Sequence, residues 1–134
     1  MAGYLGTPLP RKLGMKEGHR VAIIRAPAGI HNVLGPLPDG ATVRTRARGP
    51  LDVIVFFVTR RAELERCFDG LRRALYPTGG LWIAWPKRSS GVETDLTEDV
   101  VREVALPQGL VDNKVCAIDD TWSELRLVIR LENR

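Results

Sequence analysis

The sequence has few of the residues that build metal sites and disulfides. It contains only two cysteines and two histidines among 134 residues. Cys67 and Cys116 lie far apart in the chain, and their number fits buried thiols in a reducing compartment better than a disulfide framework. A zinc site needs several clustered ligands, and no such cluster is visible. We therefore predict no metal site and expect the protein to be cytoplasmic.

Long hydrophobic runs and a strong charge of one sign are also missing. The longest apolar run, residues 53–58, is too short to cross a bilayer. The first residues lack the apolar core of a secretory signal. The net charge of +4 is mild, whereas nucleic-acid binders concentrate basic residues on one face. These observations argue against a membrane or nucleic-acid partner.

The densest basic stretch is Arg44, Arg46 and Arg48, which alternate along a predicted strand. Alternation places all three on one face or edge of a sheet. One interpretation is a solvated edge strand that its charges protect from aggregation. The other is a stripe that contacts phosphate groups.

The motifs of several common enzyme classes are absent. The chain has no phosphate-binding G-x-x-x-x-G-K-S/T loop, no G-x-S-x-G nucleophile motif and no H-E-x-x-H metal motif. Ser89 or Ser90 could act as a nucleophile only beside a base such as His31, and a polar loop is the simpler interpretation. We therefore predict no catalytic residue.

Hydrophobic patterning divides the chain into a Gly/Pro-rich N-terminal segment, residues 1–18, and a single α/β domain, residues 19–134. Residues 51–58 are almost entirely apolar, which is typical of a central strand covered on both faces, and we expect residues 81–85 to form the adjacent, parallel central strand. In residues 59–75 the apolar side chains recur at helical spacing. The predicted strands are 20–25, 41–48, 51–58, 81–85, 113–118 and 125–131, and the predicted helical segments are 8–14, 30–34, 60–75 and 96–106.

Capping residues indicate where the two longer helices begin. Thr59 is suited to cap the first. For the second, Asp95 and Glu98 form a possible capping box, and Thr97 is the alternative cap. Both alternatives start this helix near Leu96.

Strands that alternate with helices predict an α/β fold: a single mixed, mostly parallel Rossmann-like sheet of about six strands with a C-terminal antiparallel hairpin. This layout resembles a shortened class I methyltransferase-like Rossmann fold, whose last strand is inserted beside the strand that corresponds to residues 81–85. The resemblance implies S-adenosylmethionine as cofactor. However, the loop at residues 25–29 holds one glycine, Arg48 stands where a carboxylate would bind ribose, and Thr59-Arg60-Arg61 replaces an Asn/Asp-Pro-Pro motif. We therefore expect no cofactor.

Three blocks carry a second resemblance. They are TPLPRKLGMKEGHRVAIIRAP at residues 7–27, LWIAWPKRSSGVETDLTEDVVRE at residues 81–103 and KVCAIDDTWSELRLVIR at residues 114–130, together about half the chain. They resemble a family of small bacterial proteins of unknown function, found in actinobacteria and other groups. The resemblance implies no activity and no site residues.

The carboxyl ends of parallel strands share one edge of the sheet, where open α/β sheets bind ligands. Cations, hydroxyl groups and helix N-termini converge there, and such donors suit a phosphate or carboxylate. Trp85 could add a flat apolar wall beside Trp122. An alternative is that Asp119 and Asp120 merely pair with Lys87 or Arg88. The predicted ligand-binding residues are Arg25, Thr59, Arg60, Lys87, Arg88, Ser89, Ser90, Asp119, Asp120 and Trp122.

The sequence thus predicts a non-catalytic protein that binds a small anionic ligand at the carboxyl edge of its sheet. The first alternative is a protein-interaction or scaffold module without a small-molecule ligand. The second is a divergent methyltransferase-like enzyme. The identity of a ligand or protein partner and the oligomeric state are not predicted.

Overall fold

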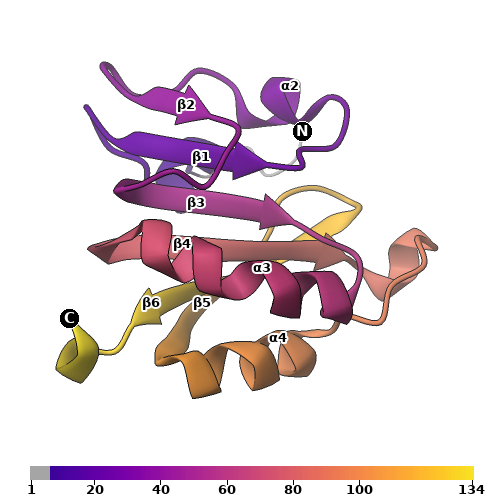
Figure 1. The fold of residues 1–134 in the computed structure, drawn as a ribbon. Helices are drawn as coiled ribbons and strands as arrows, with labels where there is room; N and C mark the ends of the chain where they lie inside the picture. Colours follow the sequence, from indigo (N-terminus) through magenta and orange to yellow (C-terminus); the bar gives the residue numbers. More distant parts are fainter. Residues whose placement is uncertain (1–6) are drawn as a thin grey trace.

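The computed structural model describes residues 7–134, which form one six-stranded mixed sheet of order β2-β1-β3-β4-β6-β5 (Figure 1). Strands β2, β1, β3 and β4 run parallel, and β6 is antiparallel to both β4 and β5. The predicted fold class is therefore confirmed. The strands are β1 (Arg20–Ile24), β2 (Thr42–Arg44), β3 (Leu51–Phe57), β4 (Leu75–Pro86), β5 (Leu110–Ala117) and β6 (Trp122–Ile129); the α-helices are α1 (Leu9–Lys12), α2 (Ile30–Leu34), α3 (Arg61–Ala74) and α4 (Glu98–Ala105); short 3-10 helices are η1 (Arg88–Ser90), η2 (Leu106–Gln108) and η3 (Leu131–Asn133).

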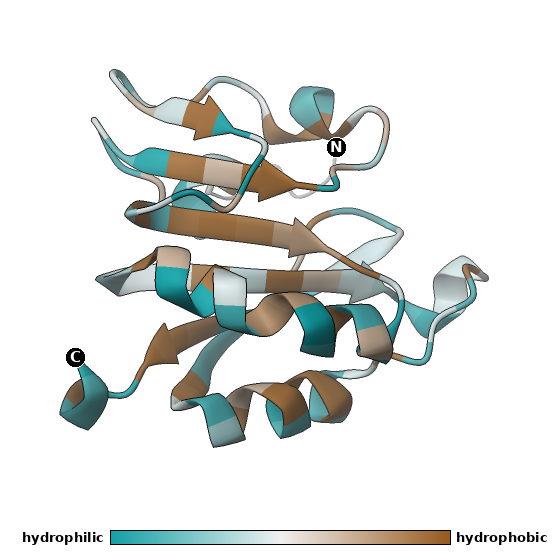
Figure 2. Ribbon diagram, in the orientation of Figure 1, coloured by the Kyte–Doolittle hydropathy of each residue, from teal (hydrophilic) through white to brown (hydrophobic). Residues whose placement is uncertain are grey.

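The centre of the sheet is the parallel pair β3 and β4. Six of the seven β3 residues are buried, with Asp52 the partly exposed one. Figure 2 shows β3 as mostly hydrophobic. The prediction that residues 51–58 and 81–85 form adjacent, parallel, central strands is confirmed, because only a strand covered on both faces tolerates so continuous an apolar run.

Two apolar clusters lie on the two faces of the sheet. Helices α3 and α4 cover one face (Figure 1), and α1 and α2 contribute apolar residues to the cluster on the other. Trp85 belongs to the first cluster and Trp82 to the second, as their odd spacing on a strand predicts. The two free thiols divide in the same way, since Cys67 packs against the first cluster and Cys116 against the second.

The helix caps differ in part from those predicted. Thr97 caps α4 and its hydroxyl accepts the N–H of Val100 at 3.2 Å, so the Thr97 alternative is confirmed and the capping box is wrong. Thr59 does not cap α3. Its place is taken by Asp95, whose Oδ1 accepts the N–H of Arg61 at 2.7 Å. The fold brings Asp95 there from a distant loop, which sequence patterns cannot show.

Several boundaries also differ from those predicted. Strand β2 ends at Arg44, so the arginines that follow it lie in a loop and the predicted strand over 41–48 is too long. Strand β4 begins at Leu75, and residues 76–80 continue it. Gly79 is needed there for close packing, because a Cβ atom on it would lie 2.6 Å from the backbone carbonyl oxygen of Asp52.

The C-terminal hairpin is longer than predicted, with β5 beginning at Leu110 and β6 at Trp122. Strand β6 is inserted beside β4, as in the fold that the sequence resembles. The predicted N-terminal segment, residues 1–18, lies partly outside the described residues, and its described part contains α1. Within residues 7–134, no helix has the length and apolar character that a membrane span needs.

Candidate functional site

The loop between β4 and α4 forms one wall of a pocket of about 520 Å³ at the carboxyl edge of the sheet. We call this hollow the β4–α4 pocket. Its floor includes Trp85 and Leu96, which are only 6% and 3% exposed. The lining residues are Trp85, Pro86, Lys87, Arg88, Gly91, Val92, Glu93, Thr94, Leu96, Thr97, Glu98 and Ser123.

Hydrogen bonds fix the first half of this loop. The N–H of Lys87 donates to the carbonyl of Thr121 at 2.7 Å, which joins the loop to the β5–β6 turn. The hydroxyl of Ser90 donates to the carbonyl of Lys87 at 2.6 Å and accepts the N–H of Val92 at 3.2 Å. Gly91 follows with φ of 78°, a left-handed conformation that glycine adopts readily. The Ser90 hydroxyl therefore fixes the conformation of the loop, so this wall of the pocket is formed without a ligand.

The second half of the loop is tied to the start of α3. The hydroxyl of Thr94 donates to the carbonyl of Thr59 at 2.6 Å and accepts the N–H of Leu96 at 3.0 Å. Asp95 then caps α3 through the N–H of Arg61. Neither Thr94 nor Asp95 was among the predicted site residues, because both act through contacts with residues more than 30 positions away.

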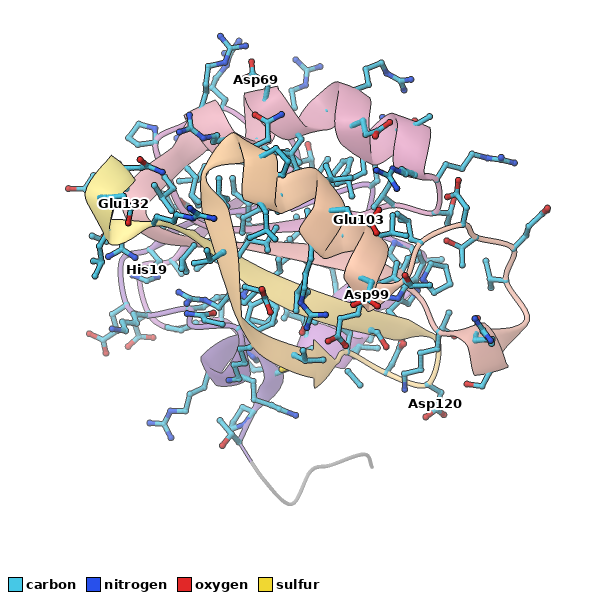
Figure 3. All side chains as sticks on the ribbon, turned by 90° about the horizontal axis from the view of Figure 1, so that it is seen from below. His19, Asp69, Asp99, Glu103, Asp120 and Glu132 are labelled. Atoms are coloured by element: carbon cyan, nitrogen blue, oxygen red, sulfur yellow. The ribbon has the colours of Figure 1, made fainter. Side chains whose placement is uncertain are left out.

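Replacing Asp95 with alanine should therefore destabilise the protein by about 1 kcal/mol, the usual effect of losing a helix cap. Urea unfolding followed by circular dichroism measures this difference. Asp120→Ala is the matched control, since Asp120 forms no hydrogen bond or ion pair through its side chain within residues 7–134 and points away from the protein (Figure 3). Equal stability of the Asp95 variant and the parent would contradict the assigned cap.

Two cations at the β4–α4 pocket have no acidic partner. Within the described part of the chain, neither Lys87 nor Arg88 forms an ion pair. Glu98 is bound instead to Arg102, whose pKa is raised by hydrogen bonds to Asp112 and Glu98. Lys87 and Arg88 are therefore available to an external anion.

The alternative in which Asp119 and Asp120 pair with Lys87 or Arg88 is wrong. Oδ1 of Asp119 accepts the N–H groups of Thr121 and Trp122 at 2.9 and 2.8 Å. These two bonds form the turn between β5 and β6. Asp119 is thus a structural residue of the turn, and Asp120 is exposed beside it.

The remaining predicted residues lie outside the pocket lining. The carbonyl of Thr59 anchors Thr94, and Arg60 is exposed at the start of α3. Ser89 is exposed in η1, next to the lining residue Arg88. Trp122 packs edge-on against Phe57, with ring centroids 5.0 Å apart, on the α1 and α2 side of the sheet. It therefore does not form a wall of the β4–α4 pocket.

Arg25 lies in a different hollow, between the end of β1 and α3. It pairs with Glu63 of α3, and its guanidinium carbon lies 5.4 Å from the ring centroid of Phe56. The hydrogen bond from Arg25 holds the pKa of the Glu63 carboxyl below its usual value. The structure thus separates Arg25 from Lys87 and Arg88, because α3 intervenes between the two hollows.

Glu124 is a further polar residue that sequence patterns did not single out. It lies in β6, is 0% exposed, and neither carboxylate oxygen has a hydrogen-bond partner within residues 7–134. Burial raises its pKa to about 8, although Lys12 and Lys114 oppose that rise. In the sequence, Glu124 and Arg126 alternate with apolar residues and therefore resemble the solvent face of a strand. The apolar cluster that covers this face of β6 includes residues of α1 and α2, which are remote from Glu124 in sequence.

Comparison with known proteins identifies the fold of the chain. No model of a protein family matches the chain, and no curated protein sequence matches it. Among solved structures, an S-adenosylmethionine-dependent methyltransferase from Aquifex aeolicus has a TM-score of 0.66 at 15% identity, covering 90% of this chain and 87% of that one. The fold is a methyltransferase-like Rossmann fold.

Two further structures support the same assignment. The DhpI–SAH complex has a TM-score of 0.62 at 12% identity and covers 92% of this chain and 83% of that chain. The Methanococcus jannaschii fibrillarin, a pre-rRNA processing protein, has a TM-score of 0.60 at 15% identity and covers 92% and 69%. These neighbours share the fold that the methyltransferase-like alternative from the sequence implies. At such identities the likeness shows the fold and not the activity.

The residues at the expected cofactor position do not fit S-adenosylmethionine. In this fold the cofactor would lie over the carboxyl ends of β1 and β2. Strand β1 ends at Ile24 and is followed by Arg25, which pairs with Glu63. Strand β2 ends in Arg44, four residues before the predicted Arg48, in place of a carboxylate for the ribose hydroxyls. Because the cofactor carries a sulfonium cation, a position bordered by arginines disfavours it.

Proposed function

We propose that the protein is a divergent methyltransferase-like protein that binds a small phosphate- or carboxylate-bearing ligand in the β4–α4 pocket. One observation carries this proposal. Lys87 and Arg88 border a pocket fixed by hydrogen bonds, and neither has an acidic partner within residues 7–134. A cationic pair in a preorganised hollow binds an anion with little loss of conformational entropy.

The shape and lining of the pocket suggest what else the ligand carries. A volume of about 520 Å³ lies within the range of small-molecule sites. The first turn of α4 adds N–H donors at its positive end, beside Thr97 and Glu98. Trp85 and Leu96 on the floor favour an apolar or flat group attached to the anion. We therefore infer a ligand with one anionic end and one apolar part.

A second candidate function is S-adenosylmethionine-dependent methyl transfer, which the structural neighbours favour. In that case the cofactor would bind at the carboxyl ends of β1 and β2, about the hollow that contains Arg25. The two candidates therefore differ in ligand charge and in location. They are separable with the intact protein.

A thermal-shift screen followed by calorimetry tests the proposal. We expect phosphosugars, nucleotides or acyl-coenzyme A to raise the melting temperature, and S-adenosylmethionine to leave it unchanged. A ligand at about 100 times its Kd stabilises the native state by about 2.7 kcal/mol, which corresponds to a rise of roughly 10 °C for a domain of this size. Stoichiometric micromolar binding of S-adenosylmethionine, with no response to the phosphate compounds, would support the second candidate.

A further inference from the structure

The fold gathers six arginines on one surface beside α3. The link from β2 to β3, residues 45–50, crosses β1 on the side of the sheet that α3 covers (Figure 1). Its Gly49 lies against the backbone of Ala74 at the end of α3. This crossing brings arginines of three elements together. We call them the arginine surface: Arg25, Arg44, Arg46, Arg48, Arg66 and Arg73.

Two hollows make up the arginine surface and meet at the link. One, of about 400 Å³, contains Arg25, Arg66 and Arg73 together with Ala47 of the link. The other, of about 560 Å³, is lined by residues 43–46 and Arg48. All six arginines are exposed. A contiguous, concave and basic surface therefore extends from α3 to the outer edge of β2.

Only part of this charge is neutralised. Arg25 and Arg66 share Glu63, and Arg73 pairs with Asp69, which lies on the outward side of α3 (Figure 3). Within residues 7–134, the three arginines of β2 and the link have no acidic partner. Arg44 donates only to the carbonyl of Arg48, at 3.4 Å. Six cations thus face two carboxylates.

We propose that the arginine surface binds the phosphodiester backbone of a nucleic acid. The sequence argued against such a partner because its mild net charge showed only the possible stripe of Arg44, Arg46 and Arg48, and the fold adds three arginines from distant segments. Every cation of this surface is an arginine, whose guanidinium group binds phosphate oxygens in a bidentate manner. Backbone contacts of this kind are independent of base sequence and weaken with salt.

The composition of the surface favours nucleic acid over an acidic protein. Protein interfaces depend on buried apolar and aromatic anchors. Among the residues that line the two hollows, Val43, at 37% exposure, is the one exposed large hydrophobic side chain. A surface of guanidinium groups without such anchors suits a regular chain of phosphates.

Fluorescence anisotropy with a labelled single-stranded RNA of about 16 nucleotides, and with a random DNA duplex, tests this proposal. The triple variant R44A/R46A/R48A is compared with R11A/K16A/R134A, which removes the same charge from exposed positions elsewhere. We expect the intact protein to bind at least one probe with Kd on the order of 10⁻⁶–10⁻⁴ M. The first variant should bind at least ~30-fold more weakly, with a salt slope lower by about 2–3, and the control should change by less than about threefold.

Three outcomes would overturn the proposal. They are no binding of either probe at low salt, an equal loss in both triple variants, or tighter binding of polyglutamate than of a nucleic acid of equal charge. Because residues 44–48 are exposed and form no ion pair within the described residues, both variants should keep the parent melting temperature. If the triple variant fails to fold, Arg46→Glu must reduce binding by the same criterion. Binding that K87A/R88A leaves intact would separate this surface from the β4–α4 pocket.

Discussion

Replacing Glu124 with glutamine should stabilise the protein by about 3 kcal/mol at pH 7, and the gain should grow with pH. The carboxyl group is completely buried without a hydrogen-bond partner within residues 7–134, and its pKa is raised from 4.5 to about 8. Each unit of difference between folded and unfolded pKa corresponds to about 1.4 kcal/mol. The unfolded state releases the proton near pH 4.5, whereas the folded state retains it up to about pH 8.

The direction of this pH dependence follows from the linkage between protonation of Glu124 and folding. A carboxyl pKa raised by folding lowers stability progressively as pH rises from about 4.5 to about 8, and the penalty is constant above that range. Urea unfolding at pH 5, 7 and 9 should therefore show parent and E124Q converging at pH 5. The difference should reach about 4–5 kcal/mol at pH 9.

Nearby charges provide a control for this prediction. Lys12 and Lys114 are the cations that oppose the raised pKa of Glu124. Lys114→Met should therefore make the parent less stable at high pH and leave E124Q almost unaffected, because an uncharged amide has no such attraction. Parallel pH curves for parent and E124Q would contradict the assigned protonation of Glu124.

Removing Lys87 and Arg88 together should weaken binding of the anionic ligand by at least ~100-fold. Each charge-assisted contact contributes about 1.5–3 kcal/mol when partly desolvated, and each 1.4 kcal/mol is a factor of ten in affinity. Stability should change little, because these side chains form no ion pair in residues 7–134 and Arg88 is exposed. Calorimetry with the phosphate compound that gives the largest thermal shift measures the effect.

R11A/K16A is the matched control, since it removes two exposed cations from the N-terminal region and leaves the pocket intact. It should retain parent affinity within about twofold. A loss of stability in K87A/R88A, with no ligand found for the parent, would show that the two residues are structural. The interaction-module alternative would then explain the surface better.

Local patterns in the sequence were sufficient for most of the elements and for the parallel central strands β3 and β4. The apolar run of β3 fixes a central strand, and Thr97 lies one residue before the helix it caps. The predictions that were wrong concern features that depend on contacts between distant segments. Asp95 replaces Thr59 as the cap of α3, and residues 76–80 belong to β4 instead of preceding the predicted strand.

The candidate site shows the same division. Lys87 and Arg88 were predictable because they follow a buried strand at the ligand-binding edge of the sheet. Arg25 was misplaced relative to them, since the position of α3 between the two hollows is not encoded in any short pattern. Of the arginine surface, the sequence singled out only Arg44, Arg46 and Arg48, because the link over β1 brings them beside arginines that are distant in the chain.

The central claim is that an anion binds in the β4–α4 pocket, and an amide nitrogen–proton NMR titration tests it most directly. With the phosphate compound selected by the thermal screen, we expect saturable shifts in the amides of residues 88–98, in Ser123, and in the indole N–H of Trp85. Shifts confined to residues 25–29 and 44–48 would instead place the ligand at the methyltransferase cofactor position and contradict the account.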